Sequence, residues 1–169
     1  AYVAQRMAEI GTPGVALALT GRERTLALRT YGYADLGART PVTPETLFEI
    51  GSIGKSFTAL ALMQEVDAGR LDLHRPLREH LPWFELPSAF EPITPHHLLC
   101  HAAGIPAGPD FTPEARFQVW AMRELQAASA PGERFHYSNL GYKALGLLLE
   151  QLTGRPYADV IGERILRPL

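Results

Sequence analysis

The chain is organised around one stretch, which reads Phe48-Glu49-Ile50-Gly51-Ser52-Ile53-Gly54-Lys55-Ser56-Phe57-Thr58. Good helix formers with almost no breakers follow from Ile53 to Asp67, so we expect a helix that begins at Ser52. Positions three residues apart share one face of a helix, and the Lys55 ammonium can therefore reach the Ser52 hydroxyl.

Two interpretations of Ser52 follow from this stretch. Serine is a preferred residue at helix starts, so Ser52 can simply cap the helix. It can also be a nucleophile, because an adjacent base activates a serine hydroxyl and burial lowers the pKa of a lysine enough to make it such a base. The first backbone N–H groups of the helix would then be donors for an oxyanion.

Two features favour the nucleophile, although both interpretations stay open on this stretch alone. Lys55 and Lys143 are the only lysines among 16 Lys and Arg residues. Lys55 also falls in an apolar run, where a lysine is a poor choice unless it has a function. The apolar residues around it are Phe48, Ile50, Ile53, Phe57, Leu60 and Leu62.

The composition is that of an ordinary globular domain and excludes several classes of partner. The chain has 169 residues, 46% hydrophobic and 20% charged, enough for one core. Its formal net charge of −2 gives no electrostatic reason to bind nucleic acid or an anionic membrane. No apolar run is long enough for a membrane span. Cys100 is the only cysteine, which excludes an internal disulfide.

The N-terminal part is predicted to hold one helix and two strands. Tyr2–Ile10 has helical spacing of apolar residues and is followed by Gly11. Residues 15–19 and 25–31 read as the two strands of a hairpin, and 32–44 as irregular connection. Because a two-stranded hairpin is marginal alone, we expect it to need further cover.

The rest of the chain is predicted to be mainly helical. The helix that begins at Ser52 should end near Gly69. The Gly- and Pro-rich loop 104–113 is typical of a site wall or lid. Further helices are expected over 95–101, with Thr94 as cap and Pro95 first, and over 114–129, 140–152 and 156–166.

A second candidate cluster is Tyr137-Ser138-Asn139, just before the apolar helix 140–152. The simple interpretation makes Ser138 or Asn139 its cap and Tyr137 a half-buried aromatic. The functional interpretation makes Tyr137 a proton relay and Asn139 an amide partner for a bound carbonyl.

These residues resemble a known superfamily, the serine β-lactamases and penicillin-binding proteins. Ser52-Ile53-Gly54-Lys55 matches its S-x-x-K motif. Tyr137-Ser138-Asn139 matches the Y-x-N form found in class C β-lactamases, related DD-peptidases and β-lactamase-like esterases. Residues 93–104 resemble the "ITxxHLLxHxSG" segment and residues 131–142 the "PGxxFxYSNxGY" segment. The resemblance covers nearly the whole chain, from about Gly14 to Leu169.

The resemblance implies a role for each matching residue. Ser52 would be the acylated nucleophile, activated by Lys55. Tyr137 would pass a proton to the leaving group and help to activate the deacylating water. Asn139 would hold a substrate carbonyl and contact Lys55. The backbone N–H of Ser52 would supply half of an oxyanion hole, and the reaction would need no metal or other cofactor.

The third motif of the superfamily, K-T-G or H-x-G, is not found in this chain. The ending at 165–169 resembles "IxxPLGM", which lies in mid-domain in the superfamily. We therefore expect an α+β fold that forms one incomplete domain over 1–169. Residues 1–50 would give an N-terminal helix and strands of an antiparallel sheet, and 51–169 a mainly helical subdomain. An unfinished sheet edge and an apolar helix face predict low stability and self-association.

Three other kinds of site fit the sequence less well. His97 and His101 lie one helical turn apart, as in zinc sites, but the H-E-x-x-H pattern is absent and two leucines between them suggest packing. The G-x-S-x-G elbow of α/β-hydrolases fails because Ile50 takes the first glycine position. Gly51 and Gly54 lack the spacing of a phosphate loop.

Two functions are therefore expected. The first is a serine hydrolase that acts through an acyl-enzyme on β-lactams, D-amino-acid peptides or small esters. The alternative is a non-catalytic module of the same fold that binds such ligands as a sensor or scaffold.

Overall fold

The computed structural model describes residues 2–106 and 114–169. The contacts of the backbone divide the chain into two compact units, Ala1–Ile50 and Gly51–Leu169. Each unit is described by itself below.

The first unit holds α1 (Tyr2–Ile10), β1 (Gly14–Thr20), β2 (Thr25–Asp35) and β3 (Thr40–Pro41). The three strands form one antiparallel sheet in the order β1-β2-β3. The predicted helix and hairpin are confirmed. The expectation of only two strands was wrong, because β2 continues to Asp35 and then pairs with β3 through a short turn.

The sheet of this unit carries exposed apolar side chains. Leu17, Leu19, Leu26 and Leu28 are between 41% and 59% exposed. An apolar sheet surface of this kind favours association with another apolar surface. Self-association of the chain stays a prediction.

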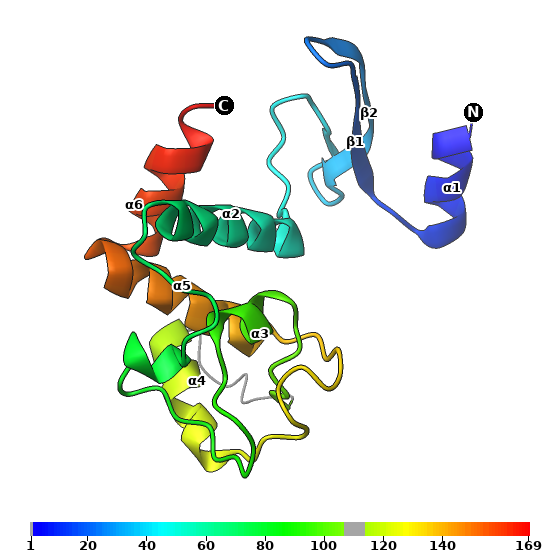
Figure 1. The fold of residues 1–169 in the computed structure, drawn as a ribbon. Helices are drawn as coiled ribbons and strands as arrows, with labels where there is room; N and C mark the ends of the chain where they lie inside the picture. The colour runs from blue at the N-terminus through cyan, green and yellow to red at the C-terminus, as the bar shows by residue number, and fades with distance from the viewer. Residues whose placement is uncertain (1, 107–113) are drawn as a thin grey trace. The chain divides into compact units, whose positions relative to one another are not determined.

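The second unit is almost entirely helical. Its elements are η1 (Gly51–Ile53), α2 (Gly54–Asp67), η2 (Leu77–Glu79), α3 (Pro95–Leu99), α4 (Ala115–Trp120), η3 (Ala121–Glu124), α5 (Asn139–Thr153), α6 (Tyr157–Ile161) and the π-helical turn η4 (Gly162–Leu166). Helix α5 contacts α2, α3, α4 and α6, so it is the central element of this unit (Figure 1). Together with the sheet of the first unit, this gives the predicted α+β class.

Helix α5 is defined at both ends by local sequence. The Ser138 hydroxyl accepts a hydrogen bond from the Gly141 N–H at 3.1 Å and so caps the N-terminus. Gly154 ends the helix in the left-handed conformation, with φ of 66°. Between these ends, Leu145 and Leu148 are fully buried, and each such leucine contributes about 1.5–3 kcal/mol through burial of apolar surface.

The short helix α3 begins as its sequence predicts. The Thr94 hydroxyl accepts from the His97 N–H, the His97 ring faces the Thr94 backbone in return, and Pro95 occupies the first turn. The helix ends at Leu99, two residues before the predicted end, because Cys100 leaves the helical conformation and His101 has a φ of 57°.

The predicted helix over 114–129 was too long. The helical residues run only from Ala115 to Glu124, and Leu125 is extended. The backbone N–H groups of Ala127 and Ala128 then donate to the carbonyls of Pro87 and Gly104. Pairing with these distant loops replaces the helical hydrogen bonds that 125–129 would otherwise make.

No helix in the described part of the chain is long and apolar enough to cross a membrane.

Candidate active site

Ser52 and Lys55 are placed by the start of the α2 segment. Gly51 has a φ of 52°, a conformation that favours glycine, and the chain then enters the turn η1, which contains Ser52. Helix α2 begins at Gly54, so Lys55 lies in its first turn. The predicted helix start at Ser52 is thus a 3₁₀ turn that leads into the α-helix. Ile53, not Ser52, occupies the N-cap position of α2, which contradicts the interpretation of Ser52 as the cap of this helix.

Tyr137 and Asn139 are placed by the start of α5. Ser138 has extended backbone angles and caps the helix, so Tyr137 precedes α5 and Asn139 is its first residue. The capping interpretation is therefore right for Ser138. The two flanking residues are left free to face α2.

The four candidate residues come together in one hydrogen-bonded cluster within the second unit. The Lys55 Nζ donates to Ser52 Oγ at 3.2 Å and to Asn139 Oδ1 at 2.8 Å. The Tyr137 hydroxyl donates to Ser52 Oγ at 2.6 Å. Ser52 Oγ thus accepts hydrogen bonds from both Lys55 and Tyr137, which belong to segments more than 80 residues apart in the sequence.

The electrostatics of the cluster centre on the ammonium group of Lys55. Its Nζ lies 4.7 Å from the ring centroid of Tyr137 and 5.6 Å from that of Tyr142, within the range of cation–π interactions. The Lys55 ammonium, and then the Ser52 hydroxyl, lower the pKa of Tyr137 below its usual value. A neighbouring cation favours the phenolate, so Tyr137 is easier to deprotonate than a free tyrosine.

The apolar flanks predicted to bury Lys55 do not do so. Ile53 is 61% exposed and Leu60 is 49% exposed, whereas Leu62 points into the core. Lys55 is half-buried instead against the aromatic rings of Tyr137 and Tyr142 and the amide of Asn139. Helical geometry explains the difference, because residues in one apolar run point in all directions around the helix.

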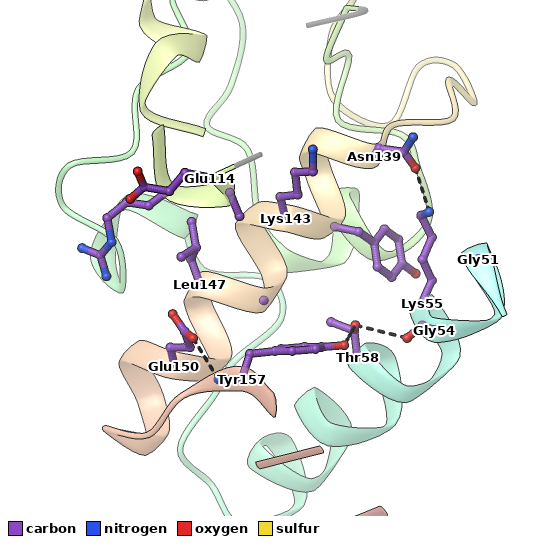
Figure 2. Close-up of a pocket in the computed structure, with 14 residues that line it drawn as sticks. Gly51, Gly54, Lys55, Thr58, Glu114, Asn139, Lys143, Leu147, Glu150 and Tyr157 are labelled. Carbon is purple, nitrogen blue, oxygen red and sulfur yellow. Dashed lines mark hydrogen bonds between the residues drawn. The ribbon is translucent and has the colours of Figure 1, made fainter. Parts of the chain in front are cut away.

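A pocket of about 620 Å³ adjoins the cluster. Lys55 and Asn139 belong to its lining, and from there it extends along α2 and α5 to Thr58 and Tyr157 (Figure 2). The Thr58 hydroxyl lies 2.7 Å from that of Tyr157, and the Tyr157 N–H donates to Glu150. Lys143 and Glu150 give this pocket charged groups of both signs, so it can accommodate a polar ligand next to Lys55.

His97 and His101, the two histidines spaced as in zinc sites, each make a hydrogen bond within the second unit. His97 Nδ1 faces the Thr94 hydroxyl at 3.1 Å, and His101 Nδ1 accepts the Ser138 N–H at 3.1 Å. Over residues 2–106 and 114–169, no group of three or more His, Cys, Asp and Glu side chains is arranged to hold a metal ion. His97 thus contacts the start of α3, and His101 contacts the turn before α5.

Tyr142 was not among the residues predicted for the site. Its ring flanks Lys55, and its hydroxyl donates to the Leu99 carbonyl at 3.0 Å. Tyr142 follows Asn139 by three residues and so shares its face of α5, a spacing that could have indicated it. Most of the loop predicted to form a wall or lid, residues 107–113 of 104–113, lies outside the described residues.

Comparison with known proteins identifies the family. A family model described as Beta-lactamase matches residues 1–169. Penicillin-binding protein 4 of Amycolatopsis lactamdurans is 36% identical in an alignment 169 residues long. The alignment covers 93% of this chain and 43% of that protein. The chain spans 33% to 43% of the length of curated relatives that it matches.

Solved structures agree with this match. The octameric penicillin-binding protein homologue from Pyrococcus abyssi has a TM-score of 0.87 and 35% identity, over 99% of this chain and 41% of that one. The D-amino acid amidase from Ochrobactrum anthropi SV3 has a TM-score of 0.79 and 31% identity, over 96% of this chain and 46% of that one. The resemblance and the fold class expected from the sequence are confirmed, and the chain belongs to the beta-lactamase family.

Proposed function

We propose that this chain carries the nucleophile of a serine hydrolase that works through an acyl-enzyme. The observation that supports this most directly is the position of Ser52 Oγ, which is hydrogen-bonded to both Lys55 and Tyr137. A serine hydroxyl needs an adjacent group to take its proton, and the Lys55–Tyr137 pair lies within 3.2 Å of Ser52 Oγ to do so.

In the proposed acylation step, Ser52 Oγ bonds to the carbonyl carbon of the substrate. The hydroxyl proton passes to the Lys55–Tyr137 pair and from there to the leaving nitrogen or oxygen as its bond to the carbonyl carbon breaks. An ammonium cannot accept a proton, whereas a phenolate can. The lowered pKa of Tyr137 therefore favours its phenolate, stabilised by the Lys55 cation, as the group that accepts the serine proton and then, as the phenol, returns it to the leaving group.

The remaining roles follow from position. The Asn139 amide, held by Lys55 through its oxygen, would present its N–H₂ group to a substrate carbonyl. The backbone N–H of Ser52, at the start of the helical segment, would donate to the developing oxyanion. A water activated by Tyr137 would then hydrolyse the acyl ester, releasing a carboxylic acid and restoring Ser52.

The proposed substrates are β-lactams, D-amino-acid peptides or small esters. The relatives described as a penicillin-binding protein and a D-amino acid amidase support this range, since penicillin and D-amino-acid amides both present a carbonyl carbon for attack by a serine. Lys143 and Glu150, in the pocket next to Lys55, would suit a substrate with polar or charged groups near the reacting bond.

The test is intact mass spectrometry after exposure to a penicillin and, separately, to a p-nitrophenyl ester. We expect a covalent adduct on the protein that disappears in Ser52→Ala. Ser56→Ala is a matched control, because Ser56 is an exposed serine one turn further along α2 and should leave the adduct unchanged. An adduct that persists in Ser52→Ala would refute the assignment of the nucleophile. Saturable binding of both probes without an adduct would favour the non-catalytic module.

A further inference from the structure

His101 connects the end of α3 to the turn that carries Tyr137. Its backbone has a φ of 57°, and only His101 and Arg39 among the described non-glycine residues have a positive φ. Its carbonyl accepts the His136 N–H at 2.7 Å, and its Nδ1 accepts the Ser138 N–H at 3.1 Å. Backbone and side chain of this one residue therefore hold the turn on both sides of Tyr137.

The ring of His101 also contacts the aromatic groups of the site. It is stacked on Tyr137, with 4.4 Å between ring centroids and 28° between planes. Tyr142 lies 5.0 Å away, and Phe135 meets the ring edge-on at 5.6 Å. The Tyr137 phenol is thus in contact with the His101 ring and the Lys55 ammonium, and its hydroxyl reaches Ser52 Oγ.

We propose that neutral His101 is a positioning residue that holds the Tyr137 hydroxyl on Ser52 Oγ, through its ring stack and its Nδ1 hydrogen bond to the Ser138 N–H. The catalytic consequence rests on the proposed function, but the positioning itself concerns only residues of this chain. His101 does not touch Ser52, so it acts through Tyr137.

The neutral form of His101 is essential to this role. An imidazolium carries a proton on Nδ1 and would set a donor against the Ser138 N–H, which is also a donor. The titratable groups facing the ring are Lys55 from α2, Tyr137 from the turn and Tyr142 from α5. Burial, and then the charge of Lys55, lower the pKa of His101, so its imidazole stays neutral to a lower pH than that of a free histidine.

Three substitutions of His101 separate its ring stack on Tyr137 from its hydrogen bond to the Ser138 N–H. His101→Asn retains an acceptor near the position of Nδ1 and tolerates a positive φ, but it loses the ring. His101→Phe retains the ring and loses the acceptor. His101→Gly keeps the backbone conformation and loses both. His74→Ala, which changes an exposed histidine outside the site, is the control.

The first measurement uses NMR and needs no substrate. In the unmodified protein, ¹⁵N shifts should show His101 with its proton on Nε2 and an unprotonated Nδ1 that accepts a hydrogen bond at neutral pH. Titration of ¹³C-labelled tyrosine should show a lowered pKa for Tyr137 that returns toward the usual tyrosine value in His101→Gly. A proton on Nδ1 at neutral pH, or an unchanged Tyr137 titration in His101→Gly, would overturn the proposal, even if no acyl substrate is found.

The second measurement is the rate of acylation of Ser52. Displacement of a reacting group by about 1 Å costs on the order of 100-fold in rate, so we expect a loss between about 10-fold and 100-fold in His101→Gly. His101→Asn and His101→Phe should each lose less than His101→Gly, and His74→Ala should match the unmodified protein. Equal acylation rates in all variants would overturn the catalytic consequence proposed for His101. Absence of any adduct in the unmodified protein would instead count against the proposed function, and the NMR results would still decide the positioning.

Discussion

The buried carboxylate of Glu65 gives the sharpest test of how α2 is held in the second unit. Glu65 is fully buried on α2. Arg70 Nε donates to its Oε2 at 2.6 Å, and Arg164, from η4, donates to its Oε1. One carboxylate thus links the helix that carries Lys55 to the C-terminal turn of the same unit. We predict that Glu65→Gln, which keeps the shape and removes the charge, destabilises this unit.

The size of the effect follows from the hydrogen bonds that the amide cannot make. Glutamine has a single acceptor oxygen, so its N–H₂ group faces one guanidinium as a donor against a donor. Hydrogen bonds to charged groups contribute about 1.5–3 kcal/mol each, so we expect the free energy of unfolding to fall by about 1.5–3 kcal/mol. Arg70→Gln is the matched comparison and should cost less, because the Arg70 side chain is 51% exposed and Arg164 still neutralises the carboxylate.

The pH dependence of the free energy of unfolding gives an independent test of whether the Glu65 carboxylate stabilises the fold. The hydrogen bond from Arg70 lowers the pKa of Glu65; burial raises it, and Arg164 lowers it further, so the net shift is downward. The unfolded chain then binds the proton more tightly than the folded one. The stabilisation is therefore complete above the ordinary glutamate pKa of about 4.3 and is lost as the pH falls through the lower folded value.

The assay is urea unfolding followed by far-UV circular dichroism, at neutral pH and in steps down to acid. The midpoint for Glu65→Gln should lie below that of the unmodified protein at neutral pH with the same slope, and the two should converge in acid as Glu65 becomes protonated. A variant as stable as the unmodified protein at neutral pH, or a difference that does not shrink in acid, would refute the reasoning.

Three further predictions concern the core, the backbone and the wall of the pocket. Leu148→Ala should lower the free energy of unfolding by about 2–5 kcal/mol because Leu148 is fully buried, and a urea titration showing little loss would contradict this. Gly104→Ala should lower the thermal midpoint more than Gly69→Ala does. The two glycines have φ of +68° and +69°, but only at Gly104 would the new Cβ lie 2.2 Å from a backbone oxygen, and equal midpoints would be the wrong result. Tyr157→Phe removes a 2.7 Å hydrogen bond to Thr58 and should cost about 0.5–1.5 kcal/mol, which a double-mutant cycle with Thr58→Val measures; no coupling would count against it.

Local sequence was sufficient to predict several elements to within a residue or two. Tyr2–Ile10, the cap at Thr94 and the ends of α5 at Ser138 and Gly154 all follow from residues a few positions apart. The i to i+3 relation of Ser52 and Lys55 is of the same kind. Such features depend on backbone conformation and side chains within one or two turns, which the sequence states directly.

The errors occurred where distant parts of the chain decide the backbone. Strand β3 has only two residues, too few for any periodic pattern, and exists because Thr40 and Pro41 pair with the end of β2. The helix predicted over 114–129 ends at Glu124, because Ala127 and Ala128 bond to loops far away in the sequence. A buried backbone group takes whichever partner the fold provides, and sequence pattern does not specify it.

The candidate site likewise combines features that local sequence sets with features that depend on distant parts of the chain. The sequence by itself determined the residue types, the pairing of Ser52 with Lys55 and the helix start that exposes Tyr137 and Asn139. Only the tertiary structure decided that the Tyr137 hydroxyl reaches Ser52 Oγ across 85 residues, and that His101 stacks on Tyr137. The physical reason is that contacts between distant segments depend on how α2, α3 and α5 pack around one core, and that packing results from many buried side chains acting together.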